Sequence, residues 1–270
     1  MSVTTEELVL AERRGAVLLL TLNRPDRMNA WTDALEERYY TLLDAAEDDP
    51  EVRAIVVTGA GRGFCSGADM EDLHGAATGE VDTEQTERAR HRYYPLTIRK
   101  PLIAAINGAA VGLGLVEALY CDVRFATRDA KLATIFARRA LVAEYGISWL
   151  LSRLVGPSAA LDLLMSGRIV TGDEALRLRL VDRLCAPESV VSEAVAYADE
   201  IARFCSPWSV ATMKKQIYAD LERPFADSFV AAERLMAESF RSTDVEEGVR
   251  SFMERRAPAF APLPPRSPAT

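Results

Sequence analysis

One stretch, residues 100–117, constrains the fold more than any other part of this 270-residue sequence. It opens with Lys100-Pro101 and continues into an apolar run over 102–106 that ends at Asn107-Gly108. A short apolar run bounded in this way is typical of a fully buried strand. Glycines at 108, 112 and 114 let backbone approach backbone or a ligand, and a helix should begin near residue 112 or 113. Because the first N–H groups of a helix lack partners within it, this corner predicts a place for negative charge.

The preceding part of the chain repeats this arrangement. Strands are predicted at 7–10 and 16–22, followed by a helix from an N-cap at Thr32 to about Ala46. Another buried strand at 54–59 leads into a second Gly-rich turn over 59–70. Residues 71–95 are polar and predict a mobile loop or a loose helix over a pocket. The repeated order of strand, strand and helix predicts a mixed α/β fold.

The chain divides by composition into a core at 1–205, a helical region at 206–257 and a Pro-rich tail at 258–270. Apolar residues lie on more than one side of the helices expected after Ser206. The first of these helices presents Val210, Met213 and Ile217 on one face. We therefore expect this region to pack against another subunit as well as against its own core.

Charge and composition exclude several classes of protein. A net charge of −8 and a pI of about 5.0 argue against a nucleic-acid partner. No apolar run approaches the ~20 residues that span a bilayer, and the first residues do not read as a signal peptide. The four cysteines are far apart and match no metal spacing. We therefore expect a cytoplasmic protein with free thiols, without a bound metal and without a membrane partner.

Short motifs follow one another along nearly the whole chain. The most specific read Leu22-Asn23-Arg24-Pro25, Gly63-Phe64-Cys65-Ser66-Gly67-Ala68-Asp69, Asn107-Gly108 and Phe252-Met253-Glu254-Arg255-Arg256. Together they resemble the crotonase superfamily of enoyl-CoA hydratases and isomerases. The resemblance implies a crotonase-like spiral of ββα units with C-terminal helices that trimerise, as a homotrimer or a dimer of trimers. It also implies an acyl-CoA thioester as substrate, with no cofactor beyond the coenzyme A that the substrate carries.

The resemblance assigns roles to backbone groups as well as side chains. In the family, two backbone N–H groups hold the thioester oxygen, and the matching positions are Ala68 and Leu113. The charge expected at the start of the helix is then an enolate oxygen. Typical hydratases of the family carry two glutamates that position water, and the matching positions are Val116 and Phe136. Ordinary hydration is therefore not expected.

Two other acidic residues remain as candidates. Glu144 matches the base position of Δ3,Δ2-enoyl-CoA isomerase-like members, whose active-site pattern this sequence resembles most. Apolar neighbours should raise the pKa of Glu144 toward neutrality. Alternatively, a glutamate at this place could have no catalytic role and only stabilise the N-terminus of the following helix through its dipole. Glu117 could face the pocket as a second catalytic acid, or it could be paired with an arginine or a backbone group.

Binding of coenzyme A is assigned in the same way. Arg27 and Ala30 match a loop along the pantetheine and adenine, Ala68 and Asp69 flank the pantetheine, and Arg255 matches a basic residue that reaches the phosphates, commonly from a neighbouring subunit. Both arginines could instead serve only surface solubility. The preferred interpretation is an enoyl-CoA double-bond isomerase with one glutamate as acid and base. An enoyl-CoA hydratase using Glu144 and Glu117, or a non-catalytic acyl-CoA-binding homologue, are the alternatives.

Overall fold

A computed structural model describes residues 5–80 and 90–266, and within them the strands form two sheets. In the larger sheet β1 and β2 are antiparallel and all other neighbours are parallel. Its spatial order is β1 (Val9–Arg14), β2 (Val17–Leu22), β3 (Ala54–Gly59), β5 (Leu102–Ile106), β7 (Val123–Thr127) and β9 (Arg183–Cys185). The smaller, parallel sheet has the order β4 (Gly63–Cys65), β6 (Ala109–Val111) and β8 (Leu132–Ala133).

The two sheets grow together as the chain advances. The strands β3, β5 and β7 enter the larger sheet, and β4, β6 and β8, which directly follow them, enter the smaller one. Helices α2 (Met70–Thr78) and α3 (Leu113–Leu119) close the units that begin at β3 and β5. This is the spiral of ββα units that the family resemblance implied, and it brings successive strand-to-helix corners side by side.

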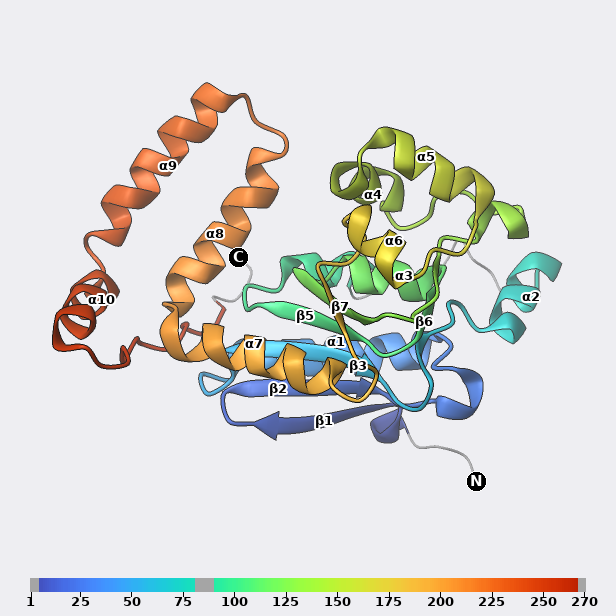
Figure 1. Cartoon of the computed structure of the whole chain (residues 1–270), viewed down its shortest axis with the longest axis horizontal. Helices are drawn as coiled ribbons and strands as arrows, with labels where there is room; N and C mark the ends of the chain where they lie inside the picture. Colours follow the sequence, from blue (N-terminus) through green and yellow to red (C-terminus); the bar gives the residue numbers. More distant parts are fainter. Residues whose placement is uncertain (1–4, 81–89, 267–270) are drawn as a thin grey trace.

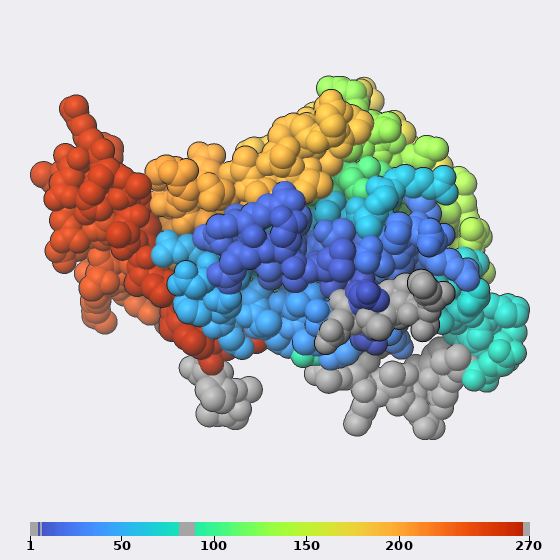
Figure 2. All heavy atoms as spheres, turned by 90° about the horizontal axis from the view of Figure 1, so that it is seen from below, coloured from blue at the N-terminus to red at the C-terminus, as the bar shows by residue number. Residues whose placement is uncertain are grey.

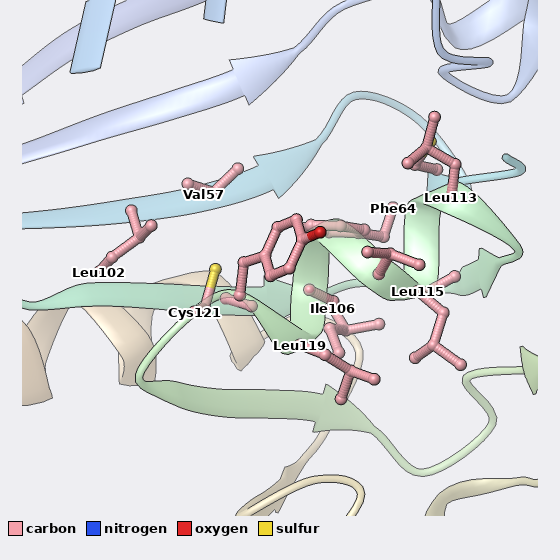
Figure 3. Packing of buried hydrophobic residues seen from close by; sticks show 14 of the residues in the cluster. Val57, Phe64, Leu102, Ile106, Leu113, Leu115, Leu119 and Cys121 are labelled. Carbon is pink, nitrogen blue, oxygen red and sulfur yellow. The ribbon is translucent and has the colours of Figure 1, made fainter. Parts of the chain in front are cut away.

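The inner strands of the larger sheet are buried on both faces, as is usual for parallel sheets with helices on either side. Alternate residues such as Val56 and Ile103 pack with Ala194 of α7 (Val190–Phe204). Their neighbours, such as Val57 and Ile106, face the main core. Figure 3 shows that core around α3, where side chains of α3 lie beside those of β4 and β5.

The remaining helices lie around the sheets or extend beyond one end of them (Figure 1). Helix α1 (Asp33–Asp48) begins at the predicted cap, where the Thr32 hydroxyl accepts a hydrogen bond from the Leu35 N–H at 3.2 Å. The other helices are α4 (Ile147–Val155), α5 (Pro157–Ser166), α6 (Gly172–Arg177), α8 (Pro207–Asp220), α9 (Phe225–Ser239) and α10 (Thr243–Glu254). Short 3-10 turns are η1 (Thr5–Glu7), η2 (Pro25–Arg27), η3 (Tyr94–Thr97) and η4 (Phe136–Arg139).

The sequence-based description needs two corrections. Both Gly-rich turns contain a short strand, β4 or β6, and these strands belong to a sheet that the sequence did not predict. Residues 71–95, expected as a mobile loop or a loose helix, begin with the regular helix α2, which Asp69 caps by accepting a hydrogen bond from the Glu71 N–H. The expectation of mobility over 81–89 lies outside the described residues.

Helices α8 to α10 project from one end of the molecule (Figures 1 and 2). Apolar side chains on them are exposed in a single chain, and Phe225 and Phe252 are 82% and 84% exposed. The tail then returns to the core, where Leu263 is buried and Arg266 forms an ion pair with Asp44 at 2.8 Å. None of the described helices has the length and apolar character that a membrane crossing requires.

Candidate active site

The loop before α1 is fixed against the β3–β4 turn by one buried side chain. The Asn29 amide donates hydrogen bonds to the carbonyl oxygens of Ala60 and Gly63, each at 2.9 Å, and its oxygen accepts one from the Arg24 N–H at 2.8 Å. Met28 and Asn29 both have φ near +55°, a conformation that asparagine tolerates better than most residues. The loop that carries Arg27 and Ala30 therefore has a defined path beside residues 63–69.

The Ala68 N–H points away from its neighbouring strand. Trp31 donates its N–H to the Gly67 carbonyl at 2.8 Å and accepts a hydrogen bond from the Asp69 N–H at 2.9 Å. In a parallel bridge of this kind, the residue between the two bonded positions turns its own N–H to the opposite side. Among the described residues, nothing accepts a hydrogen bond from the Ala68 N–H.

The Leu113 N–H lies at the start of α3, where the sequence predicted it. Gly112 precedes it with φ +54° and ψ −122°, a combination that only glycine adopts readily, and its carbonyl accepts the first bonds of the helix. The Leu113 N–H has no acceptor within the part of the chain that the structure describes. Helix α3 has only seven residues, so we attribute its capacity to bind an anion to this N–H rather than to a long helix dipole.

Close backbone contacts hold the turn that carries the Ala68 N–H against the start of the helix that carries the Leu113 N–H. A side-chain carbon added to Gly67 would lie 2.8 Å from the Val111 carbonyl oxygen and 3.7 Å from the Leu113 nitrogen. A carbon added to Gly114 would lie 2.3 Å from the Cys65 carbonyl oxygen. Only glycine fits at these positions, and the turn before Ala68 therefore lies directly against the start of α3. The arrangement can hold one oxygen that accepts two hydrogen bonds.

Val116 and Phe136 are both buried in the core, at 0% and 4% exposure. Neither side chain can accept a proton or hold a water molecule. Both positions are therefore filled by buried apolar side chains and offer no acid.

Glu144 is half-buried in the turn before α4. Its carbonyl accepts the N–H of Ile147, which begins that helix, at 3.0 Å. Burial raises the pKa of the Glu144 carboxyl, and the positive charge of Arg92 opposes part of this rise. The turn is fastened to α3, because the Tyr120 hydroxyl donates a hydrogen bond to the Tyr145 carbonyl oxygen. Glu144 is thereby tied to the helix that begins at Leu113.

Glu117 lies one helical turn after Leu113 and is only 3% exposed. The expected arginine or backbone partner is absent, because neither carboxyl oxygen has a hydrogen-bond partner among the described residues. Burial raises the pKa of Glu117 well above its ordinary value, Glu36 raises it further, and Arg92 lowers it. Burial therefore favours the protonated, neutral form of this carboxyl group, and a neutral carboxyl is less costly to bury than a charged one.

A series of polar contacts runs from the residue beside Ala68 to the residue beside Glu144, and sequence reasoning missed it. Trp31 beside Ala68 donates its indole N–H to the Glu36 carboxylate at 2.9 Å. Arg92 Nε lies 3.3 Å from Glu36 Oε2, and Arg92 also donates to the Tyr145 hydroxyl beside Glu144. One signal could have revealed this series, because Glu36 lies on the buried stripe of α1 together with Tyr40 and Leu43. An acid on an apolar stripe requires a partner.

The residues assigned to coenzyme A do not all meet in one chain. Ala30 is buried, Arg27 is exposed with an ion pair to Glu71 at 3.2 Å, and the Asp69 carboxylate is paired with Arg24 at 2.9 Å. Arg255 directly follows α10, which lies at the opposite end of the molecule from α2 (Figure 1). Arg255 of the same chain therefore cannot join the other four positions.

Comparison with known proteins gives consistent matches. The sequence profile described as enoyl-CoA hydratase/isomerase matches residues 12–262. A putative enoyl-CoA hydratase of Thermus thermophilus is 36% identical over 92% of this chain and 98% of its own length. A 1,2-epoxyphenylacetyl-CoA isomerase of Escherichia coli is 32% identical over 94% of this chain and 98% of its own length. The crystal structure of an enoyl-CoA hydratase from Mycobacterium marinum is 47% identical, covers 80% of this chain and 100% of its own, and gives a TM-score of 0.69.

Proposed function

Because the chain belongs to the enoyl-CoA hydratase/isomerase family, we propose that it is an enoyl-CoA double-bond isomerase with Glu144 as its single acid–base residue. One observation carries the proposal. The two positions where typical hydratases of the family have glutamates are occupied by the buried Val116 and Phe136, while Glu144 remains half-buried with a raised pKa. An allylic shift needs one group that takes a proton and returns it, whereas hydration needs a water held and polarised.

The proposed reaction moves one proton. The Glu144 carboxylate takes a proton from C2 of a 3-enoyl-CoA, and the electron pair shifts onto the thioester oxygen to give a dienolate. The N–H groups of Ala68 and Leu113 donate hydrogen bonds to this oxygen, each typically worth ~3–4 kcal/mol in the transition state. The protonated Glu144 then returns the proton at C4, which leaves the double bond between C2 and C3. No electrons leave the substrate, so the reaction requires no cofactor besides the attached coenzyme A.

The raised pKa of Glu144 suits this sequence of steps. A carboxylate with an ordinary pKa is a weak base toward a carbon acid. A carboxyl group whose pKa is closer to 7 takes the proton more readily and can still return it in the second step. The pH dependence follows directly. Activity requires the ionised carboxylate, so it falls as the pH decreases through the raised pKa, at a pH above the ordinary range of glutamate.

We propose that coenzyme A lies along Arg27, Ala30, Ala68 and Asp69 of one chain. Asp69 contributes its backbone, since its carboxylate is already paired with Arg24. Arg255 would reach the phosphates from a neighbouring chain, because it lies at the far end of its own. The substrate site proposed here is therefore completed by a second copy.

A trimer or a dimer of trimers is the expected assembly in solution. Helices α8 and α9 bury no residue of their own within the chain, and their exposed apolar side chains provide the surface for contact between copies. Sedimentation velocity at micromolar concentration should give the mass of three or six chains of 29.7 kDa. A monomer under these conditions would contradict the assembly and the proposed role of Arg255 together.

A hydratase remains the second candidate, since several relatives are named as enoyl-CoA hydratases. Such a reaction would require Glu144 and Glu117 to hold the water. Incubation with 3-enoyl-CoA and with 2-enoyl-CoA, each followed by chromatography, separates the possibilities. We expect 3-enoyl-CoA to become 2-enoyl-CoA without 3-hydroxyacyl-CoA. Rapid hydration without isomerisation would replace the proposed reaction, and binding without turnover of either substrate would identify a non-catalytic homologue.

A further inference from the structure

Arg92 joins two elements on either side of the candidate site. Its Nε lies 3.3 Å from Glu36 Oε2 and its Nη2 lies 3.2 Å from Asp33 Oδ1, and both acids belong to α1. Its Nη1 donates a hydrogen bond to the Tyr145 hydroxyl, and the guanidinium lies 4.6 Å from the centre of the Tyr145 ring. Arg92 therefore connects α1 to the turn that carries Glu144.

This turn has a conformation that local preference does not provide. Tyr145 has φ +54° and Gly146 has φ +70°, so two successive residues are left-handed. A residue with a large side chain adopts this conformation at a cost of roughly 1–2 kcal/mol, and it persists only where the surroundings hold it. Contacts that hold Tyr145 include the Tyr120 hydroxyl at its carbonyl oxygen and Arg92 at its ring and hydroxyl.

The same guanidinium supplies positive charge to both candidate acids. It lowers the pKa of Glu144 and of Glu117 against the larger effect of burial. Other polar groups linked to the turn or to Arg92 include Tyr120, at the end of α3, whose hydroxyl bonds the Tyr145 carbonyl oxygen. Asp33 and Glu36 of α1 pair their negative charges with Arg92, and Glu117 of α3 also lies within the influence of its charge. Since Arg92 is the charge that opposes burial at Glu144, its removal should favour the protonated acid.

We propose that Arg92 is a positioning residue of the acid–base step, which orients Glu144 by holding the Tyr145 turn and places a positive charge beside that turn. The inference rests on the proposed role of Glu144. It assigns two separable effects to one side chain. Orientation depends on the planar, forked guanidinium, whereas the charge effect depends only on a cation at this place.

Three variants separate these effects. Arg92→Gln removes both effects, so we expect kcat to fall about 10²-fold, as for a displaced catalytic group. In a plot of kcat against pH, the acidic limb, where activity is lost as the pH falls, should move to higher pH. Arg92→Lys keeps the charge but cannot stack and bridge, so kcat should fall while the limb stays near the wild-type position. Arg90→Gln is the matched control, because Arg90 also pairs with acids of α1, Glu37 and Asp44, and its side chain is 23% exposed against 18% for Arg92. It should leave kcat and the limb unchanged.

A titration without substrate distinguishes this inference from the proposed function. The carbon-13 signal of the Glu144 carboxyl, assigned by its loss in Glu144→Gln, should titrate at higher pH in Arg92→Gln than in the wild type. An unchanged titration and an unchanged acidic limb in Arg92→Gln would overturn the inference, even if kcat falls. Full activity of Glu144→Gln would instead overturn the proposed function, while the titration still tests the contact between Arg92 and the Glu144 turn.

Discussion

Glu144→Gln should lower the kcat for isomerisation of 3-enoyl-CoA by about 10²–10⁴-fold, the usual effect of losing a positioned acid–base group. The amide has nearly the same size and remains able to form hydrogen bonds, but it can neither take the proton from C2 nor return it at C4. The affinity for acyl-CoA should change little, because binding depends on backbone donors and the coenzyme A loop. Steady-state kinetics and calorimetric binding of a saturated acyl-CoA measure the two effects separately.

Glu117→Gln is the matched comparison, since it makes the same substitution in the other acid of this region. We expect it to retain most isomerase activity. Loss of isomerisation in Glu117→Gln, together with full activity in Glu144→Gln, would show that Glu117 is the acid–base residue. Hydration should be assayed in both variants as well, because the alternative reaction would use both acids.

The stability of Glu117→Gln provides an internal check on this comparison. Burial raises the pKa of Glu117, so the folded chain still holds this proton at a pH where the unfolded chain has released it. The free energy of unfolding of the wild type therefore falls by about 1 kcal/mol per pH unit above the ordinary range of glutamate, until Glu117 ionises. The glutamine variant lacks this titration, so its stability in urea relative to the wild type should increase as the pH rises above the ordinary range of glutamate.

Leu113→Pro should lower kcat by about 10²–10³-fold, the usual effect of removing one oxyanion donor. Proline is favoured in the first turn of a helix, where its missing N–H breaks no helical hydrogen bond. The preceding residue is Gly112, which tolerates the backbone angles that a following proline requires. The change therefore removes the N–H expected to face the enolate oxygen while α3 can still form.

Leu113→Ala is the control, because it shortens the same side chain but keeps the N–H. It should lose stability through the reduced packing of a residue that is 4% exposed, with a much smaller change in kcat. Thermal unfolding of both variants shows whether they remain folded at the assay temperature. Equal kcat values for the proline and alanine variants would mean that the Leu113 N–H does not contact the reacting oxygen.

Sequence reasoning predicted the inner strands of the larger sheet but not its edge strand β9, and it did not predict the smaller sheet. The runs at 54–59 and 102–106 are long enough and apolar enough to indicate buried strands, and both form as expected. The strands β4, β6 and β8 contain only two or three residues each, which is too short for any periodic pattern. Their existence depends on the pairing of two Gly-rich turns that are distant in sequence.

The candidate site divides in a similar way. Backbone donors leave no side-chain signal of their own, but the glycines around them do. Gly112 and Gly114 indicated a helix that begins near residue 112 or 113, and α3 does begin at Leu113. The roles of Arg92 and Tyr145 depend on which side chains meet across the fold, and neither residue type is distinctive in a polar segment. The expected partner for Glu117 was wrong for a related reason, since a buried acid can also be accommodated by keeping its proton.

The interleaved growth of the two sheets also determines how the chain can reach this structure. Neighbouring positions such as Ile55 and Leu102 belong to successive turns of the spiral, and the intervening segment must be closed into a loop before they pair. Helices α1 and α7 can form early because their hydrogen bonds are local. Each inner strand completes its pairing only when the next ββα unit of the spiral folds against it. Folding kinetics should therefore follow contact order and be slow, on the scale of milliseconds to seconds or longer. Until β9 joins β7, the growing edge of the larger sheet is the place where a partly folded chain is most exposed to aggregation.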